Sequence, residues 1–155
     1  MIIPSRSNRL NSMQISSRFT LAVHILACIA TFQNKTKVTS EFLASSTNVN
    51  PVIVRNILSL LKRASIVSVQ RGSGGAALLR DPEEITFLDI YRAVECIDNG
   101  QLFHFHENPS QLCPVGRNIH RVLDGKLDDV QKALEDKLGS ITLASVTDSL
   151  GSMMK

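Results

Sequence analysis

The sequence has few features of a secreted or membrane-bound protein. Its longest apolar run, residues 19–32, is interrupted by His24 and is too short to cross a bilayer. The three cysteines, Cys28, Cys96 and Cys113, are an odd number without close spacing, which argues against a disulfide framework. We therefore expect a cytoplasmic protein, whose 43% of apolar residues suffices for one domain or a compact pair of subdomains.

Acidic residues are nearly absent from the first half of the chain. Residues 1–80 contain ten Lys or Arg residues and the single acid Glu41, which gives a formal charge of +9. Residues 81–155 contain seven Lys or Arg residues and thirteen acids, which gives −6 and accounts for the net charge of +3. This separation indicates a nucleic acid or another anionic partner for the first half, with an ordinary solvated surface as the alternative.

Periodicity predicts a helix-turn-helix in this basic half. The strongly apolar residues 16–33 predict a largely buried helix. Thr39 predicts the start of a short second helix, and Asn50 followed by Pro51 predicts the cap and first turn of a longer third one. Two helices with so short a connection form a helix-turn-helix.

A change of periodicity follows these helices. Residues 66–69 and 76–79 read as strands, and RGSGG at residues 71–75 predicts a glycine-rich hairpin tip between them. A helix-turn-helix followed by a hairpin is a winged helix. The expected fold is therefore mainly α-helical with a small β-hairpin wing.

Further helices are predicted after Pro82. Thr86 starts an amphipathic helix, Pro114 starts a long one that Gly125 weakens, and Thr142 starts a short one that folds back. The long helix cannot bury its whole apolar stripe in a small domain, so we expect it to pair with the same helix of a second chain, although packing on its own domain is the alternative. The predicted dimer interface consists of Ile119, Val122, Leu123, Leu127, Val130, Leu134 and Leu138.

These patterns divide the chain into parts. Residues 1–12 are polar and without periodicity, and we interpret them as a leader or a disordered arm. Residues 13–81 are predicted to form a winged helix-turn-helix DNA-binding domain, and residues 82–150 a helical dimerisation and sensing region.

The predicted third helix has an outward side without acids. Its inward side is predicted to consist of Ile53, Ile57, Leu60 and Leu61. Arginine can pair with guanine and asparagine with adenine through two hydrogen bonds each, whereas Lys62 and Arg63 near the helix end suit phosphates. The residues predicted to contact DNA are Asn50, Val52, Arg55, Asn56, Ser59, Lys62 and Arg63.

The hairpin tip predicts a second DNA contact. Its arginine supplies positive charge, and its glycines permit close approach to a sugar-phosphate backbone. The predicted wing contacts are Arg71, Gly72, Gly74 and Gly75. The tip lacks the Gly-Lys-Ser/Thr ending of a nucleotide-binding loop and lies between strands, so it does not indicate such a loop.

Several segments together resemble the Rrf2 family of bacterial transcription regulators, the group that contains IscR, NsrR and CymR. They are LLKRASIVSVQRGSGGAALLRDP, ITFLDIYRAVE and CPVGRNI, and the resemblance extends from Met13 to Leu150. HENP followed by CPVG is similar to the YwnA-like branch. The resemblance implies a homodimeric winged-helix DNA binder, usually a repressor, whose long helices cross at the dimer interface. We expect the operator of such a protein to be palindromic.

The resemblance also implies particular roles and one absence. Base reading falls on Asn50, Val52 and Arg55, with Arg71 on the wing, and cluster-binding members carry a glutamate at the position of Arg55, so a different operator is expected. Those members place three cysteines in the loop before the long helix. Only Cys113 matches, because Cys96 lies sixteen intervening residues upstream. An iron–sulfur cluster of that type is therefore not expected.

Cys113 has candidate chemistry of its own. If Pro114 is the first residue of its helix, the amide N–H groups, the helix dipole and Arg117 would favour the thiolate, which makes Cys113 a candidate redox-sensing thiol. The preferred interpretation is a small residue that serves capping and packing. His104 and His106 could join Cys113 in a zinc site, but no clear fourth ligand is present, so no metal is predicted.

These features favour a sequence-specific DNA-binding transcriptional regulator, a homodimeric repressor. The alternatives are a winged-helix protein-interaction module and a thiol-based redox sensor without a metal cluster. An enzyme with a Cys113 and His106 pair would lack an orienting third group, so no catalytic residue is predicted. His24 and Cys28, four residues apart on the first helix, have metal-ligand spacing but are interpreted as core residues.

Overall fold

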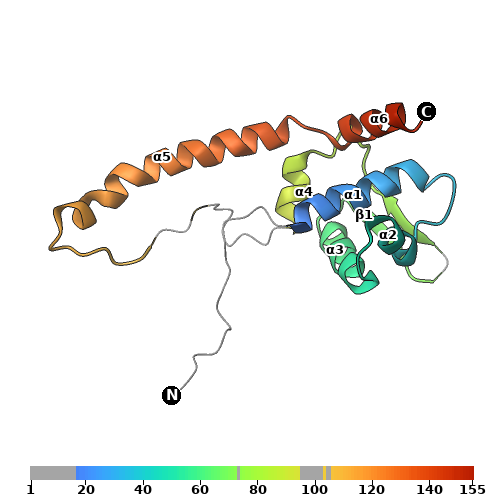
Figure 1. Cartoon of the computed structure of the whole chain (residues 1–155), viewed down its shortest axis with the longest axis horizontal. Coiled ribbons are helices and arrows are strands. Elements are labelled where there is room, and N and C mark those ends of the chain that lie inside the picture. The colour runs from blue at the N-terminus through green and yellow to red at the C-terminus, as the bar shows by residue number, and fades with distance from the viewer. Residues whose placement is uncertain (1–16, 73, 95–102, 104–105) are drawn as a thin grey trace, which may run out of the picture.

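The computed structural model describes residues 17–72, 74–94, 103 and 106–155. Its elements are α1 (Ser17–Phe32), α2 (Ser40–Thr47), α3 (Pro51–Arg63), β1 (Val67–Gln70), β2 (Gly75–Leu78), α4 (Phe87–Val94), α5 (Pro114–Gly139) and α6 (Leu143–Met153). Helices α1 to α4, the hairpin and α6 form one body, from which α5 extends away (Figure 1). The order of elements confirms the predicted winged helix.

Capping residues determine where α2 and α3 begin. The hydroxyl oxygen of Thr39 accepts a hydrogen bond of 3.2 Å from the Phe42 amide, and Oδ1 of Asn50 accepts one of 2.8 Å from the Val52 amide. Between the two helices, Asn48 has a positive φ of 55° and ends α2 by donating its amide to the carbonyl of Ala44. The turn is therefore short and defined by side chains, and it fixes α3 relative to α2.

A single core cluster holds the body together. Helix α1 packs against α2, α3, α4, α6 and β2, and Phe19 on α1 makes edge-to-face contacts with Phe87 and Tyr91, at centroid distances of 5.5 and 6.1 Å. Ile85 and Leu143 are fully buried in the same cluster. The core thus continues across residue 81, where the sequence suggested a domain boundary.

The wing is attached to the segment between α1 and α2. The amide of Ala76 donates to the carbonyl of Val38 at 2.8 Å, and the amide of Leu78 donates to Oε1 of Gln33 at 2.9 Å. Gly75 has a φ of +69°, and a Cβ there would lie 2.9 Å from the carbonyl oxygen of Val38. The antiparallel register pairs Val67 with Leu78, Ser68 with Ala77, Val69 with Ala76 and Gln70 with Gly75. The base of the wing is therefore held next to the start of α2.

Backbone pairing returns the chain to the body after α5. The amide of Phe87 donates to the carbonyl of Ile141, and the amide of Leu143 donates to the carbonyl of Ile85, both at 2.8 Å. These bonds flank a β-bridge between Thr86 and Thr142. Helix α6 consequently packs beside α1, as the predicted fold-back required.

Helix α5 contributes little to this core. Val122 is 60% exposed and Val130 is 52% exposed, whereas Leu138 is only 8% exposed. Leu138 joins the core cluster of the body, and Leu134 packs against its edge. The structure thus assigns the last residue of the predicted dimer stripe to the chain's own core, because α5 meets the body only at its C-terminal end.

Candidate nucleic-acid interface

Helix α3 presents a polar, basic face away from the core. Every residue of this helix and its cap that the sequence analysis assigned to DNA is exposed, and none of α3 is acidic. The buried residues of α3 are Val54, Ile57, Leu58 and Leu61. The exposed predicted residues are Asn50, Val52, Arg55, Asn56, Ser59, Lys62 and Arg63. The N-terminal cap, the exposed face and the two cations at the end of α3 form one continuous surface.

One assignment on α3 was wrong. Ile53 was predicted to face inward, but it is 47% exposed, beside Val52 at 53%. Val54 and Leu58 are buried beside the correctly predicted Ile57 and Leu61, and Leu60 is half-buried. Three consecutive apolar residues begin this helix, so periodicity could not decide which of them faces the core. The exposed face therefore starts with two adjacent apolar side chains, and Ile53 is a surface residue that the sequence analysis missed.

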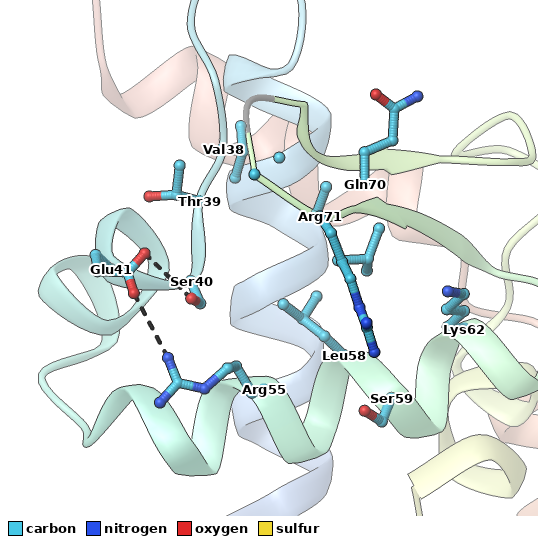
Figure 2. Close-up of a pocket in the computed structure, with 14 residues that line it drawn as sticks. Val38, Thr39, Ser40, Glu41, Arg55, Leu58, Ser59, Lys62, Gln70 and Arg71 are labelled. Atoms are coloured by element: carbon cyan, nitrogen blue, oxygen red, sulfur yellow. Dashed lines mark hydrogen bonds and ion pairs between the residues drawn. The ribbon is translucent and has the colours of Figure 1, made fainter.

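A groove separates α3 from the wing (Figure 2). It has a volume of about 510 Å³ and is formed by the start of α2, one flank of α3 and the wing. Arg71 extends from the wing toward α3, and Lys62 lies on the α3 side of the same groove. Its polar and glycine lining residues are Thr39, Ser40, Glu41, Arg55, Ser59, Lys62, Gln70, Arg71, Gly72 and Gly75. The groove thus brings part of the predicted helix contacts together with the wing: Arg55, Ser59 and Lys62 of α3 with Arg71, Gly72 and Gly75, whereas Asn50, Val52, Asn56, Arg63 and Gly74 lie outside its lining.

An ion pair crosses this groove between α2 and α3. Nη1 of Arg55 lies 3.5 Å from Oε1 of Glu41, and Oε2 of Glu41 accepts a hydrogen bond of 3.2 Å from the Ser40 hydroxyl. The Glu41 backbone amide and the Ser40 hydroxyl, followed by the charge of Arg55, lower the pKa of Glu41 below its ordinary value. The carboxylate is therefore charged at neutral pH. From the sequence, Glu41 is only one negative charge, because its partner Arg55 lies fourteen residues further along the chain.

A second hollow lies on the opposite flank of α3. It is lined by Ser17, Arg18 and Leu21 of α1 and by Ile53, Asn56, Ile57, Ser59, Leu60 and Arg63 of α3. Nη1 of Arg18 donates a hydrogen bond of 3.1 Å to the carbonyl of Val94. This bond joins residues that are 76 positions apart, so no local pattern indicates that Arg18 borders the predicted DNA-binding face.

The conformation of the hairpin explains why glycines occupy the wing. Gly72 has a φ of +81° and Gly75 a φ of +69°, which L-residues with side chains rarely adopt. Gly74 is exposed, and a Cβ there would clash with the side chain of Gln70. These glycines are therefore required by the hairpin itself, whether or not they approach a sugar-phosphate backbone.

Cys113 lies at the cap of α5, as predicted. Its side chain is exposed and does not accept a capping hydrogen bond at the start of α5. The backbone amides of Gly116 and then Val115 lower the pKa of the Cys113 thiol below its ordinary value. Arg117, which the sequence analysis also invoked, is not among the causes.

His106, considered as a zinc ligand together with Cys113, contacts another histidine. His106 stacks on His120 at a centroid distance of 5.6 Å, and Nδ1 of His120 lies 3.3 Å from Oδ1 of Asp124. Among the described residues, no three His, Cys, Asp or Glu side chains gather as metal ligands would. His104 and Cys96, which the sequence analysis considered, lie outside the described residues.

His24 and Cys28, both on α1, differ in their exposure to solvent. Cys28 is buried as expected, but His24 is exposed, so its assignment to the core was wrong. Both contact the hydroxyl of Ser46 on α2, from Nε2 of His24 at 3.0 Å and from the sulfur of Cys28 at 3.2 Å. These contacts join α1 to α2.

A helix-turn-helix with a hairpin wing and a basic exposed α3 defines the class of winged-helix DNA-binding proteins. Residues 15–149 match the model of the Rrf2 family, described as an iron-dependent transcriptional regulator. The chain belongs to this family of transcriptional regulators, as the sequence resemblance indicated. The family is one of regulators and not of enzymes. No described helix is long and apolar enough to cross a membrane.

Similar proteins agree with this assignment. YwnA of Bacillus subtilis (strain 168), named as an HTH-type transcriptional regulator, is 43% identical over 136 residues, which cover 88% of this chain and 98% of YwnA. A crystal structure described as a DNA-binding protein is 39% identical, with a TM-score of 0.66, and the match covers 83% of this chain and 97% of that one. IscR of T. potens shares the fold at 22% identity and a TM-score of 0.65, with 90% of each chain covered.

Proposed function

We propose that the protein is a homodimeric repressor that binds a palindromic DNA operator through α3 and the wing. One observation supports this proposal above the others: Arg55, Ser59 and Lys62 of α3 line the same groove as Arg71 of the wing, within the half of the chain that carries a charge of +9. A recognition helix flanked by a basic wing fits the major groove and the adjacent backbone of a duplex.

The N-terminal half of α3 would read the bases. Residues at the start of a recognition helix lie deepest in the major groove. Val52 and Ile53 are exposed there and suit the methyl group of thymine, while Arg55 suits guanine and Asn56 suits adenine. Oδ1 of Asn50 caps α3, which leaves its amide nitrogen for an acceptor on DNA. Lys62, Arg63 and Arg71 would contact phosphates.

Helix α5 would pair two chains. Its stripe between Ile119 and Leu134 extends beyond the body, with Val122 and Val130 mainly exposed. Two antiparallel copies of such a stripe would bury each other around a two-fold axis. A two-fold dimer presents two recognition helices, so its operator would be a palindrome.

Selection from a pool of randomised DNA duplexes tests the proposal. We expect the wild-type dimer to enrich a palindrome, and Arg55→Ala to lose about 1–3 kcal/mol at one base pair of each half-site. Lys62→Ala should weaken binding to all sequences and lower the salt dependence by about one counterion per subunit. The control is Lys132→Ala, which removes a cation from the exposed surface of α5.

Two outcomes would contradict this function. A folded dimer that enriches no sequence cannot be a sequence-specific regulator. Binding of an acidic protein, together with a shallow salt dependence on DNA, would instead indicate a winged-helix protein-interaction module.

We further propose that the regulator has no resident iron–sulfur cluster or zinc ion and does not act as an enzyme. The described residues offer no group of three suitable ligands, and Cys113 is the only match to the cysteine triad of cluster-binding members. Metal analysis and absorption spectra of protein purified without oxygen test the first point. A brown, iron-containing sample would contradict it. The proposed operator binding places the protein in the cytoplasm.

A second candidate function is thiol-based sensing by Cys113. Its support is an exposed sulfur whose pKa the amides of Gly116 and Val115 lower. Oxidation with peroxide should then change operator affinity in the wild type and leave Cys113→Ser unaffected. Equal responses of both proteins would exclude this role.

A further inference from the structure

The single acid of the basic half lies on the proposed DNA-binding face. Glu41 is in the first turn of α2 and lines the groove together with Arg55, Lys62 and Arg71. A carboxylate at this place repels DNA phosphates, so it lowers the general affinity for DNA. A useful role for Glu41 in a DNA-binding protein would therefore be to help discriminate between DNA sequences.

The geometry joins Glu41 to the residue best placed to read guanine. Its Oε1 lies 3.5 Å from Nη1 of Arg55, while Ser40 donates to its other oxygen at 3.2 Å. The two partners belong to α2 and α3, and the capped turn between these helices fixes their relative position. The Arg55 side chain is still 53% exposed, and a guanidinium has five N–H donors, so donors remain for a base edge while Glu41 is bound.

We propose that Glu41 is a positioning residue that sets DNA specificity through Arg55, an inference that rests on the proposed operator binding. On non-specific DNA, Glu41 keeps the charge of Arg55 neutralised and removes it from phosphate contacts. On the operator, Glu41 orients the guanidinium so that its free donors meet N7 and O6 of guanine. Glu41 therefore weakens non-specific binding more than it weakens operator binding.

A neutral variant separates these two effects. Glu41→Gln keeps the size of the side chain and removes its charge, and we expect tighter binding to a scrambled duplex. The ratio of operator affinity to scrambled-duplex affinity should fall by about fivefold, which corresponds to the upper range for an exposed ion pair. Fluorescence anisotropy titrations of both duplexes measure this ratio. The selected base at the Arg55 position should also become less strictly guanine.

Two further variants provide the controls. Glu135→Gln removes the same charge from another exposed pair with a 3.5 Å separation, to Arg92, and should leave the ratio unchanged. Glu41→Asp keeps the charge but shortens the side chain, so its carboxylate no longer reaches Arg55 and the ratio should fall here too. Thermal unfolding of all variants should remain cooperative, with small losses of stability only, because Glu41 lies outside the core.

A double-mutant cycle decides whether Glu41 acts through Arg55. In an Arg55→Ala background, Glu41→Gln should no longer change the ratio. An equal change in both backgrounds, or no change in the wild-type background, would overturn the role of Glu41 while leaving operator binding intact. If the wild type itself selects no sequence, the proposed function fails and this inference fails with it.

Discussion

The body and helix α5 differ in how far their apolar side chains are buried. In the body, residues from every helix and both strands share one core, with Ile25, Leu43 and Leu143 fully buried. In α5, a stripe of the same residue types leaves Val122 and Val130 more than half exposed. The body therefore buries its own apolar side chains, whereas most of α5 leaves such side chains partly exposed.

This difference matches the two tasks that the proposed dimer would require. A rigid body keeps α3 and the wing in a fixed relation, because capping, wing attachment and the α6 backbone bonds all connect to one core. In the proposed dimer, the projecting α5 would set how far apart the two bodies lie. Leu138 marks the border, since it is the one residue of α5 that is buried in the core of the body.

The same substitution on either side of this border should have different consequences. Leu138→Ala is expected to lower the free energy of unfolding by about 2–4 kcal/mol, equally at low and at high protein concentration, because a core cavity is intramolecular. Leu127→Ala should have an effect that depends on protein concentration, because its proposed contact is with a second chain. Chemical denaturation at two concentrations measures both. A concentration-dependent loss at Leu138 would contradict its assignment to the core.

Charges in the stripe should separate the subunits without unfolding the body. The double variant Val122→Asp and Val130→Asp is expected to be a monomer by light scattering and to lose operator affinity by about 100-fold, because two half-sites are no longer bound together. The melting curve of the body should still show cooperative unfolding. The control pair Arg121→Gln and Lys132→Gln makes the same change in charge on the other side of α5. A dimeric aspartate variant would argue against pairing through this stripe.

Glycine to alanine changes should have opposite signs in the two regions. At Gly75 a side chain meets the carbonyl of Val38 and an unfavourable positive φ, so the variant should lose about 1–2 kcal/mol of stability. At Gly125, in the middle of α5, a Cβ has nothing within 4 Å, and alanine should add about 0.5–1 kcal/mol. Thermal denaturation followed by circular dichroism distinguishes them. A Gly75→Ala variant as stable as the wild type would show that the wing base tolerates a side chain.

Much of this arrangement could be predicted because local chemistry determines it. The Asn50 cap with Pro51, the change to strand periodicity and the helix start at Pro114 were all recognised from neighbouring residues, and the structure agrees. The exposed face of α3 followed from its polar residues. The dimer, expected from the apolar stripe of α5 and implied by the family resemblance, remains a prediction.

The misses involve residues whose surroundings come from distant parts of the chain. Ile53 stands in an apolar run that fits two helical registers, and only the packing of α3 on the body shows which one is adopted. Arg18 and Glu41 acquire partners in α4 and α3. Leu138 continues the stripe in sequence, yet the return of the chain through Ile141 places it in the core.

Thiol reactivity should also differ between the body, which contains Cys28, and the start of α5, where Cys113 lies. In a Cys96→Ser background, Cys113 should react with iodoacetamide at neutral pH, because a lowered pKa increases the fraction of thiolate there. The buried Cys28 should react only on unfolding. Peptide mass spectrometry over a pH series should place the midpoint for Cys113 below that of a model thiol, about 8.5. A midpoint at or above that value would remove the amide effect, and with it the physical basis for sensing at the start of α5.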